Sequence, residues 1–222
     1  MIQIAIDGPA GSGKSTMAKL IANQLKINYM DTGAMYRAFA YALIDKGIEI
    51  NDHAAVRAAM PEISVTVEYH EDGQHVFANG KDVTGLIRTP QISKGASDVA
   101  VIPEVRFELV ETQRRTAEQY DIVMDGRDIG TYVLPDAPLK FYITADSRER
   151  ANRRLKEFNA AGIEKDIDEL EKEIIARDKT DSEREFAPLR QAEDAVLIDT
   201  TNMTIPEVQS AIVEKIKEVY GV

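Results

Sequence analysis

Short apolar runs alternate along this chain with longer stretches in which apolar residues recur every three or four positions. The short runs predict buried β-strands, and the longer stretches predict amphipathic helices. The expected strands are Ile2–Ile6, a shorter run ending at Met30, Ile122–Met124, Leu139–Ile143 and Ala195–Ile198. The expected helices are Ser15–Gln24, Gly33–Lys46, Pro103–Gln119, Ser147–Phe158, Asp166–Glu183 and Ile205–Val219. Because buried strands that alternate with helices form parallel sheets, we expect an α/β fold with helices on both faces of the sheet.

One stretch departs from this rhythm. Ile63–Phe77 alternates apolar and polar residues at the two-residue period of a strand, with a glycine-containing turn in the middle. This pattern predicts an antiparallel hairpin, and we interpret residues 61–98 as a small β-rich insertion. His70 and His75 flank the turn, but the pattern offers no third ligand nearby. We therefore expect histidines exposed to solvent rather than a metal site.

Composition narrows the class of protein. A chain of 222 residues with 44% hydrophobic and 29% charged residues fits one soluble α/β domain, and we expect a monomer. Cysteine is absent, which suits the reducing cytoplasm, and no apolar run approaches membrane-spanning length. The formal charge of −11 argues against nucleic-acid and membrane partners, because such polyanions select basic surfaces.

The most specific motif follows the first predicted strand at once. Its sequence has the spacing G-x-x-x-x-G-K-[ST] of a phosphate-binding loop between a strand and a helix, and it indicates that the protein binds a nucleoside triphosphate with Mg²⁺. The glycines let backbone N–H groups turn inward, Lys14 can reach the outer phosphates, and the Ser15 hydroxyl can bind Mg²⁺. The residues expected to bind the triphosphate are Gly8, Pro9, Ala10, Gly11, Ser12, Gly13, Lys14, Ser15 and Thr16.

A stripe of residues on the expected helix Asp166–Glu183 begins apolar and ends charged. Its members recur every three or four positions: Ile167, Leu170, Ile174, Arg177, Asp181 and Arg184. A solvated face would place the charges opposite the apolar residues. We therefore expect either a site for an anionic ligand or an internal ion-pair network, and the excess of arginine favours the ligand.

Two further polar groups follow predicted strands. Asp125–Asp128 lies at the carboxyl end of the strand Ile122–Met124, where doubly wound sheets bind their ligands. Asp125 is suited to Mg²⁺ through water and Arg127 to a phosphate, although a plain polar turn is the alternative. Asp31–Arg37 follows the strand that ends at Met30 and begins a helix. The Thr32 hydroxyl could therefore equally be a helix cap.

Two classes of phosphate-loop protein remain, a nucleotide-hydrolysing switch and a kinase for a small acceptor. The guanine-binding motif Asn-Lys-x-Asp of a GTPase does not occur in the sequence, which disfavours the switch. Within the kinase class, a nucleoside monophosphate kinase that uses UMP or AMP as its acceptor stays open as an alternative.

Taken together, the motifs resemble the bacterial cytidylate kinases. The resemblance spans nearly the whole chain, through Gly8–Thr16, Asp31–Arg37, Ser97–Arg106 with Asp125–Asp128, and Arg177–Leu189. It implies a five-stranded parallel sheet, a monophosphate-binding insertion and a helical lid at about 147–165. The core would then consist of residues 1–60 and 99–222. The implied reaction moves the γ-phosphoryl group of Mg·ATP to CMP or dCMP.

The resemblance also implies roles for individual residues. The acceptor phosphate would be held by Thr32, Arg37, Arg127 and Arg184, and the sugar side by Arg177 and Asp181. Ser97, Arg106 and Asp128 would bind the base, and Tyr36 belongs to the same acceptor-binding set. The residues expected to act on the transferring phosphoryl group are Lys14, Arg127, Arg153 and Arg184, and the expected Mg²⁺ ligands are Ser15 directly and Asp125 through water. Arg150 and Arg154 share a helical face with Arg153, whereas for Arg148 we expect a solvated position.

Overall fold

The computed structural model describes residues 1–160 and 162–221. The chain forms two compact units, which we call the phosphate-loop unit (Met1–Ile27 with Val123–Val222) and the hairpin unit (Asn28–Ile122). The hairpin unit is longer at both ends than the expected insertion of residues 61–98, whose boundaries stay a prediction. The expected lid and core include residues 161 and 222, which lie outside the described residues.

A parallel sheet carries the strands that the apolar runs predict. Its five strands have the order β2-β6-β1-β7-β8. Their bounds are β1 (Gln3–Asp7), β2 (Asn28–Asp31), β6 (Ile122–Gly126), β7 (Leu139–Thr144) and β8 (Val196–Asp199). Strand β7 pairs in parallel with β1 on one side and with β8 on the other. Ile4, Ala5 and Ile6 of β1 are fully buried, as a strand covered on both faces requires.

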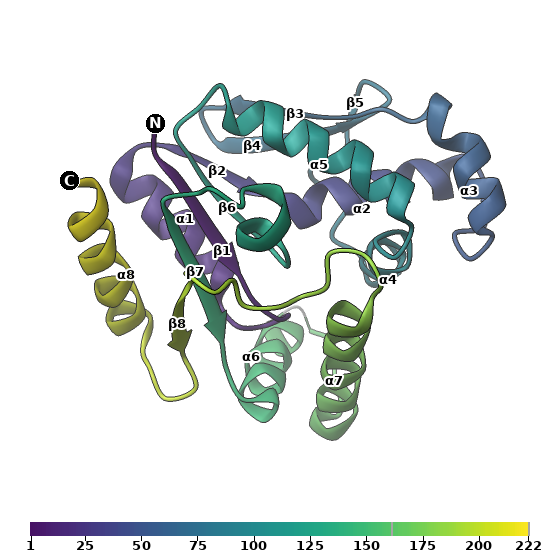
Figure 1. The fold of residues 1–222 in the computed structure, drawn as a ribbon. Helices are drawn as coiled ribbons and strands as arrows, with labels where there is room; N and C mark the ends of the chain where they lie inside the picture. Colours follow the sequence, from purple (N-terminus) through teal and green to yellow (C-terminus); the bar gives the residue numbers. More distant parts are fainter. Residues whose placement is uncertain (161, 222) are drawn as a thin grey trace. The chain divides into compact units, whose positions relative to one another are not determined.

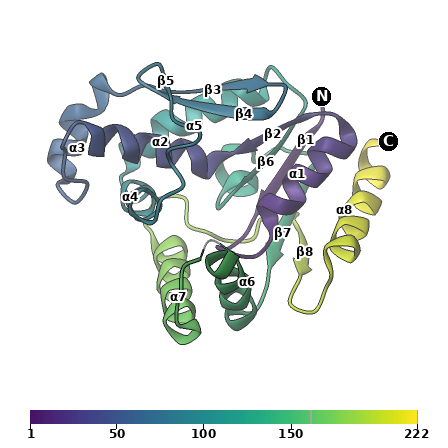
Figure 2. The ribbon, with the colours of Figure 1, turned by 180° about the vertical axis from the view of Figure 1, so that it is seen from behind.

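The α-helices of the phosphate-loop unit begin and end close to the predicted bounds. They are α1 (Lys14–Leu25), α6 (Ser147–Ala160), α7 (Ile167–Glu183) and α8 (Ile205–Tyr220). A π-helical turn, η2 (Ile129–Val133), was not predicted. Figures 1 and 2 show α1 beside α8, and the side chains of Gln24 and Gln209 join these two helices. A capping box of Thr204 and Glu207 starts α8, as its sequence predicts.

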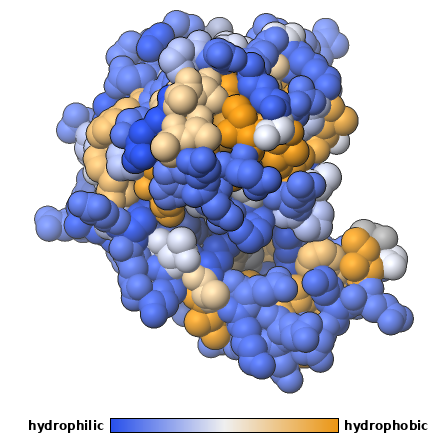
Figure 3. Space-filling view, turned by 90° about the vertical axis from the view of Figure 1, so that its right-hand side faces the viewer, coloured by the Kyte–Doolittle hydropathy of each residue, from blue (hydrophilic) through white to orange (hydrophobic). Residues whose placement is uncertain are grey.

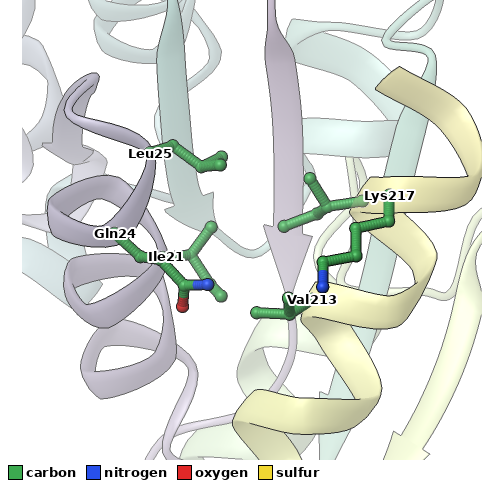
Figure 4. A pocket seen from close by; sticks show the side chains of 6 residues that line it. Ile21, Gln24, Leu25, Val213 and Lys217 are labelled. Carbon is green, nitrogen blue, oxygen red and sulfur yellow. The ribbon is translucent and has the colours of Figure 1, made fainter. Parts of the chain in front are cut away.

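A pocket of about 300 Å³ lies between α1 and α8. Ile21 and Leu25 of α1 line one side, and Val213 and Lys217 of α8 line the other (Figure 4). None of the residues that line this pocket belongs to the loop Gly8–Thr16. The pocket is therefore a feature of helix packing and not a part of the phosphate-binding loop.

The hairpin unit contains the expected antiparallel strands. Its elements are α2 (Thr32–Asp45), α3 (His53–Ala59), the 3₁₀ turn η1 (Met60–Glu62), β3 (Val65–His70), β4 (Gly73–Ala78), β5 (Lys81–Asp82), α4 (Pro90–Val99) and α5 (Pro103–Ala117). Strands β3, β4 and β5 form an antiparallel three-stranded sheet. The exposed large hydrophobic residues of the hairpin unit include Leu86 and Phe107. Figure 3 shows apolar side chains among hydrophilic ones on one face of the molecule.

Two helices of this unit were not expected. Helix α3 has only seven residues, too few for the apolar spacing to stand out. Helix α4 begins within the stretch 61–98 that we interpreted as β-rich and ends one residue beyond it, so the last part of that stretch is helical. The start of α4 carries a recognisable signal. Thr89 is the N-cap residue, whose hydroxyl accepts a hydrogen bond from Ile92 N, and Pro90 occupies the first turn. None of the helices in the described part of the chain combines the length and apolar character that a membrane crossing needs.

Candidate active site

The loop between β1 and α1 has the backbone shape that phosphate binding needs. Gly8, Gly11 and Gly13 have φ values of 152°, 75° and 90°, which side chains rarely allow. A Cβ atom on Gly8 would lie 2.0 Å from the carbonyl oxygen of Ile143 in β7. Glycine at position 8 is therefore required both by its conformation and by the close approach of the neighbouring strand. Gly13 is the N-cap residue of α1, so the loop leads directly into the N-terminus of that helix.

Lys14 and Ser15 are the first two residues of α1. The Lys14 ammonium group is largely buried and donates a hydrogen bond to the carbonyl oxygen of Pro9 at 3.2 Å, so the side chain lies over its own loop. The Ser15 hydroxyl donates to Oδ2 of Asp125 at 2.7 Å, although the two residues are 110 positions apart. Asp125 lies in β6 and is buried. The structure thus joins a hydroxyl and a carboxylate, the hard oxygen donors that Mg²⁺ prefers.

Two arginines of α6 contact the backbone of the phosphate loop. Arg150 is buried and donates from Nη1 to the carbonyl oxygen of Ala10 at 3.2 Å. Arg153 donates from Nη1 to the carbonyl oxygen of Ser12 at 3.3 Å. The resemblance implied a role for Arg153, and the sequence placed Arg150 and Arg154 on the same helical face. The contact with Ala10 now distinguishes Arg150 as a residue of this site.

The other two arginines of α6 lie away from the loop. Arg154 is exposed and pairs with Glu157. Arg148 is also exposed and pairs with Asp168 and Glu171 of α7. Both pairs lie on the surface, where such interactions contribute little. Arg148 thus has the exposed position that we expected, with the added role of joining α6 to α7.

The end of β6 and the end of α7 are joined by ion pairs. Arg127 donates from Nε to Asp181 at 2.7 Å, and Arg184 donates from Nη2 to Asp128 at 3.1 Å. Arg184 and Asp128 are both almost fully buried. Burial by itself raises the pKa of Asp181, but the positive charges of Arg127, Arg177 and Arg184 outweigh it and hold that pKa below its usual range.

The charged end of the α7 stripe therefore faces inward, as its spacing predicts. Its apolar beginning is also buried, because Leu170 and Ile174 pack with Ala151 of α6 in one cluster. The sequence left two alternatives for the charged end, an ion-pair network and a ligand site. The structure shows the ion pairs directly. A guanidinium group has five N–H donors, so pairing with one carboxylate does not exclude a phosphate partner.

Asp7 is a site residue that the sequence analysis missed. It ends β1, is buried, and accepts hydrogen bonds from the backbone N–H groups of Ile129 and Gly130, both at 2.7 Å. These two residues directly follow Arg127 and Asp128, so Asp7 holds the segment that carries both. Burial raises the pKa of Asp7 to about 7, although the two N–H groups oppose the rise. A carboxylate at the end of an otherwise apolar strand is the sequence signal that could have revealed it.

In the hairpin unit, the start of α2 is organised around Asp31. Its side chain caps the helix by accepting from Ala34 N at 3.0 Å, and it pairs with Arg37 at 2.7 Å. The Gln74 side chain of β4 in turn accepts from Asp31 N at 2.7 Å. Thr32 is buried in the first turn and is not the cap. The cap interpretation of the Thr32 hydroxyl is therefore wrong, and its expected contact with a ligand stays a prediction.

The residues expected to bind the base lie in both units. In the hairpin unit, Arg106 of α5 is fully buried, with its guanidinium carbon 5.4 Å from the centre of the Tyr36 ring. Its Nη1 donates to the carbonyl oxygen of Ala100 at 3.3 Å. Ser97 of α4 is half-buried and donates to the carbonyl oxygen of Ser93. Asp128 belongs to the phosphate-loop unit, where it pairs with Arg184.

Comparison with known proteins decides the family. The sequence profile described as "Cytidylate kinase" matches residues 4–218 of this chain. The chain belongs to the cytidylate kinase family.

Its curated relatives agree over almost their whole length. A protein of Geobacillus thermodenitrificans (strain NG80-2) named "Cytidylate kinase" is 50% identical over 220 residues, covering 99% of this chain and 98% of the relative. A protein of the same name from Limosilactobacillus reuteri (strain DSM 20016) is 50% identical over 218 residues, covering 98% and 96%. Among solved structures, an uncharacterized protein from Eubacterium ventriosum (ATCC 27560) has a TM-score of 0.54 at 15% identity, covering 98% of this chain and 99% of that one. This last likeness bears on the fold alone.

Proposed function

We propose that this protein transfers the γ-phosphoryl group of Mg·ATP to CMP or dCMP, giving ADP and CDP or dCDP. The observation that carries the proposal is the phosphate loop with Lys14 over it, in a chain that belongs to the cytidylate kinase family over residues 4–218. Relatives named "Cytidylate kinase" that are 50% identical in sequence to this chain support the same acceptor.

The donor would bind at the phosphate loop. Phosphoryl transfer needs alignment of the reacting oxygens and neutralisation of charge more than covalent chemistry. The loop N–H groups and the N-terminus of α1 would bind the phosphates, and the Lys14 ammonium would neutralise charge on the transferring group. Arg153 of α6, whose guanidinium already contacts the loop backbone, would add a second positive charge from the lid. Arg150 is placed by its contact with Ala10 to support the same loop.

The residues present fit Mg²⁺. The Ser15 hydroxyl oxygen and Oδ2 of Asp125 lie 2.7 Å apart, and oxygen is the ligand type that this ion selects. Ser15 would bind the ion directly and Asp125 through water. When bound, Mg²⁺ would neutralise charge on the phosphate oxygens. Holding and orienting the acceptor would fall to the side chains of the protein.

The acceptor phosphate would be bound by one hydroxyl group and three arginines. Thr32 and Arg37 would contribute from the first two turns of α2, and Arg127 and Arg184 from the positions directly after β6 and α7. A phosphate monoester is already mostly ionised at pH 7, because its second pKa is about 6. No general base is therefore needed, and the arginines act by orienting the attacking oxygen. Closure of the lid and the insertion would exclude water and prevent hydrolysis of the triphosphate.

The base would be recognised by a complementary set of donors and acceptors. Cytosine offers an amino donor beside two acceptors, so Asp128 and the Ser97 hydroxyl would accept hydrogen bonds while Arg106 donates. Uracil would present a carbonyl to Asp128 instead, at a cost of roughly 1–3 kcal/mol. Arg177 and Asp181 would contact the sugar. Tyr36, whose ring lies against the Arg106 guanidinium, would position that arginine.

A coupled assay of ADP release across CMP, dCMP, UMP and AMP tests the proposal. We expect CMP and dCMP to be the preferred acceptors. Preference for UMP or AMP would instead indicate a nucleoside monophosphate kinase with a different acceptor, the alternative that the sequence left open. Slow ATP hydrolysis that added CMP leaves unchanged would favour a nucleotide-hydrolysing switch. We further propose that the protein acts as a monomer in the cytoplasm, because one chain contains every proposed site residue and no cysteine.

A further inference from the structure

The hairpin β3–β4 carries a cluster of metal-ligating side chains outside the proposed active site. In the register of this hairpin, His70 lies opposite Gly73, and His75 lies opposite Glu68. The sequence pattern suggested no third ligand beside the two histidines. The structure corrects that premise, because Asp72 of the turn lies with them. One ligand atom from each of His70, Asp72 and His75 lies within 4.8 Å of the others.

The three side chains lie close to one another at the turn of the hairpin. The His70 and His75 rings stack with their centroids 4.3 Å apart and their planes 17° from parallel. Nε2 of His75 lies 2.9 Å from Oδ1 of Asp72. Two ligands of a tetrahedral zinc ion, each bound at about 2.0–2.1 Å, are separated by roughly 3.3 Å. The contact between His75 and Asp72 is close to that separation. Binding of a shared ion would require the His70 ring to turn out of its stack with His75, so that its in-plane nitrogen points at the ion.

A second layer of carboxylates supports the histidines. Nδ1 of His75 lies 2.8 Å from Oδ2 of Asp82, and Asp82 is itself held because its Oδ1 accepts from Thr84 N at 2.9 Å. A metal-bound histidine usually donates its other ring N–H to such a carboxylate, which sets the tautomer and the ring orientation. Glu68 lies 3.0 Å from Nε2 of His70 and places a further carboxylate within reach.

We propose that His70, Asp72 and His75 form a binding site for one divalent cation of the zinc class. Two imidazoles and one carboxylate suit Zn²⁺, Ni²⁺ and Co²⁺, whereas Mg²⁺ prefers an all-oxygen shell. The site is thus chemically distinct from the Ser15–Asp125 pair. It is also independent of the proposed kinase reaction, so either proposal can fail while the other holds. The alternative is a network of ion pairs on the surface of the hairpin that binds no metal.

The sequence provides a matched control for the test. The chain contains three histidines and no cysteine, so His53 is the remaining imidazole and no thiolate competes for the metal. His53 is exposed at the start of α3 and lies outside the cluster. Zn²⁺ is titrated calorimetrically into the nucleotide-free protein with excess Mg²⁺ present. We expect one saturable site per chain in the wild type and in His53→Gln.

His70→Gln, His75→Gln and Asp72→Asn should each weaken Zn²⁺ binding at least tenfold. Their circular dichroism spectra should match that of the wild type, because all three side chains lie on the hairpin surface. Affinity and stoichiometry that these variants leave unchanged would overturn the proposal, and so would a wild type with no saturable site. A readout on the unmodified chain uses substoichiometric Ni²⁺, a paramagnetic ion. It should broaden the imidazole proton resonances of His70 and His75 and spare His53, whereas equal broadening of all three resonances would contradict the site.

Discussion

Replacing Asp128 by Asn tests whether this carboxylate recognises the base. In the structure Asp128 pairs with Arg184 at 3.1 Å, and both side chains are almost fully buried. Removing one partner of a buried ion pair typically costs about 3–5 kcal/mol, so an alanine at this position would combine folding and recognition effects. Asparagine keeps the volume and one acceptor. It also introduces an amino donor, which suits the carbonyl of uracil better than the amino group of cytosine.

The CMP-to-UMP ratio of kcat/KM is the informative quantity, because both acceptors are measured on the same folded enzyme and losses of stability cancel. A change of 1–3 kcal/mol in base recognition predicts that Asp128→Asn lowers this ratio by about 5- to 150-fold. Asp181→Asn is the matched control, since Asp181 is also a largely buried carboxylate paired with an arginine, at 2.7 Å. Its ratio should stay near that of the wild type. An equal fall in kcat/KM for both acceptors in Asp128→Asn would refute the role of Asp128 in base recognition.

Three further predictions follow from the phosphate-loop unit. Lys14→Ala should lower kcat by orders of magnitude while leaving the urea-unfolding midpoint near that of the wild type, and wild-type turnover would contradict the role of the Lys14 ammonium. Gly8→Ala should destabilise the fold by about 3 kcal/mol or more, because φ at this position is 152° and an alanine Cβ would lie 2.0 Å from the carbonyl oxygen of Ile143. Gly47→Ala is the control, since φ is 69° there and no heavy atom lies within 4 Å of the added Cβ. In thermal unfolding, Gly47→Ala should lose far less stability than Gly8→Ala. The pKa of Asp7 is raised from 3.8 to about 7 in the folded state, so its contribution to stability is full below pH 3.8 and is lost as the pH rises to 7. Between pH 5 and 8 the wild type should lose about 2–3 kcal/mol of unfolding free energy relative to Asp7→Asn, and parallel pH profiles of the two proteins would count against this shift.

Local patterns in the sequence predicted the frame of the fold. The apolar runs predicted all five strands of the parallel sheet, and the spacing from Ile167 to Asp181 predicted which side of α7 faces inward. The phosphate loop could also be found, because its glycines are adjacent in the chain and each is needed for a local backbone conformation. These features depend on residues close in sequence, where periodicity and turn chemistry carry the information.

The partners of the charged residues could not be predicted in this way. Ser15 and Asp125 are 110 positions apart, and Arg127 and Asp181 are 54 apart, so the fold alone brings them together. The role of Asp31 as the cap of α2 shows a second limit. Asp and Thr are both good caps, and the sequence Asp31-Thr32 does not say which one lies before the first helical turn.

The central claim is phosphoryl transfer to a cytidine nucleotide, and the most direct measurement follows the phosphoryl group itself. The protein is incubated with ATP labelled in its γ-phosphate, Mg²⁺ and CMP, and the label is separated by chromatography. The account predicts that the label appears in CDP, one for each ADP formed, and that UMP supplied in place of CMP receives it far more slowly. Recovery of the label mainly as inorganic phosphate, at a rate that CMP does not change, would contradict the account.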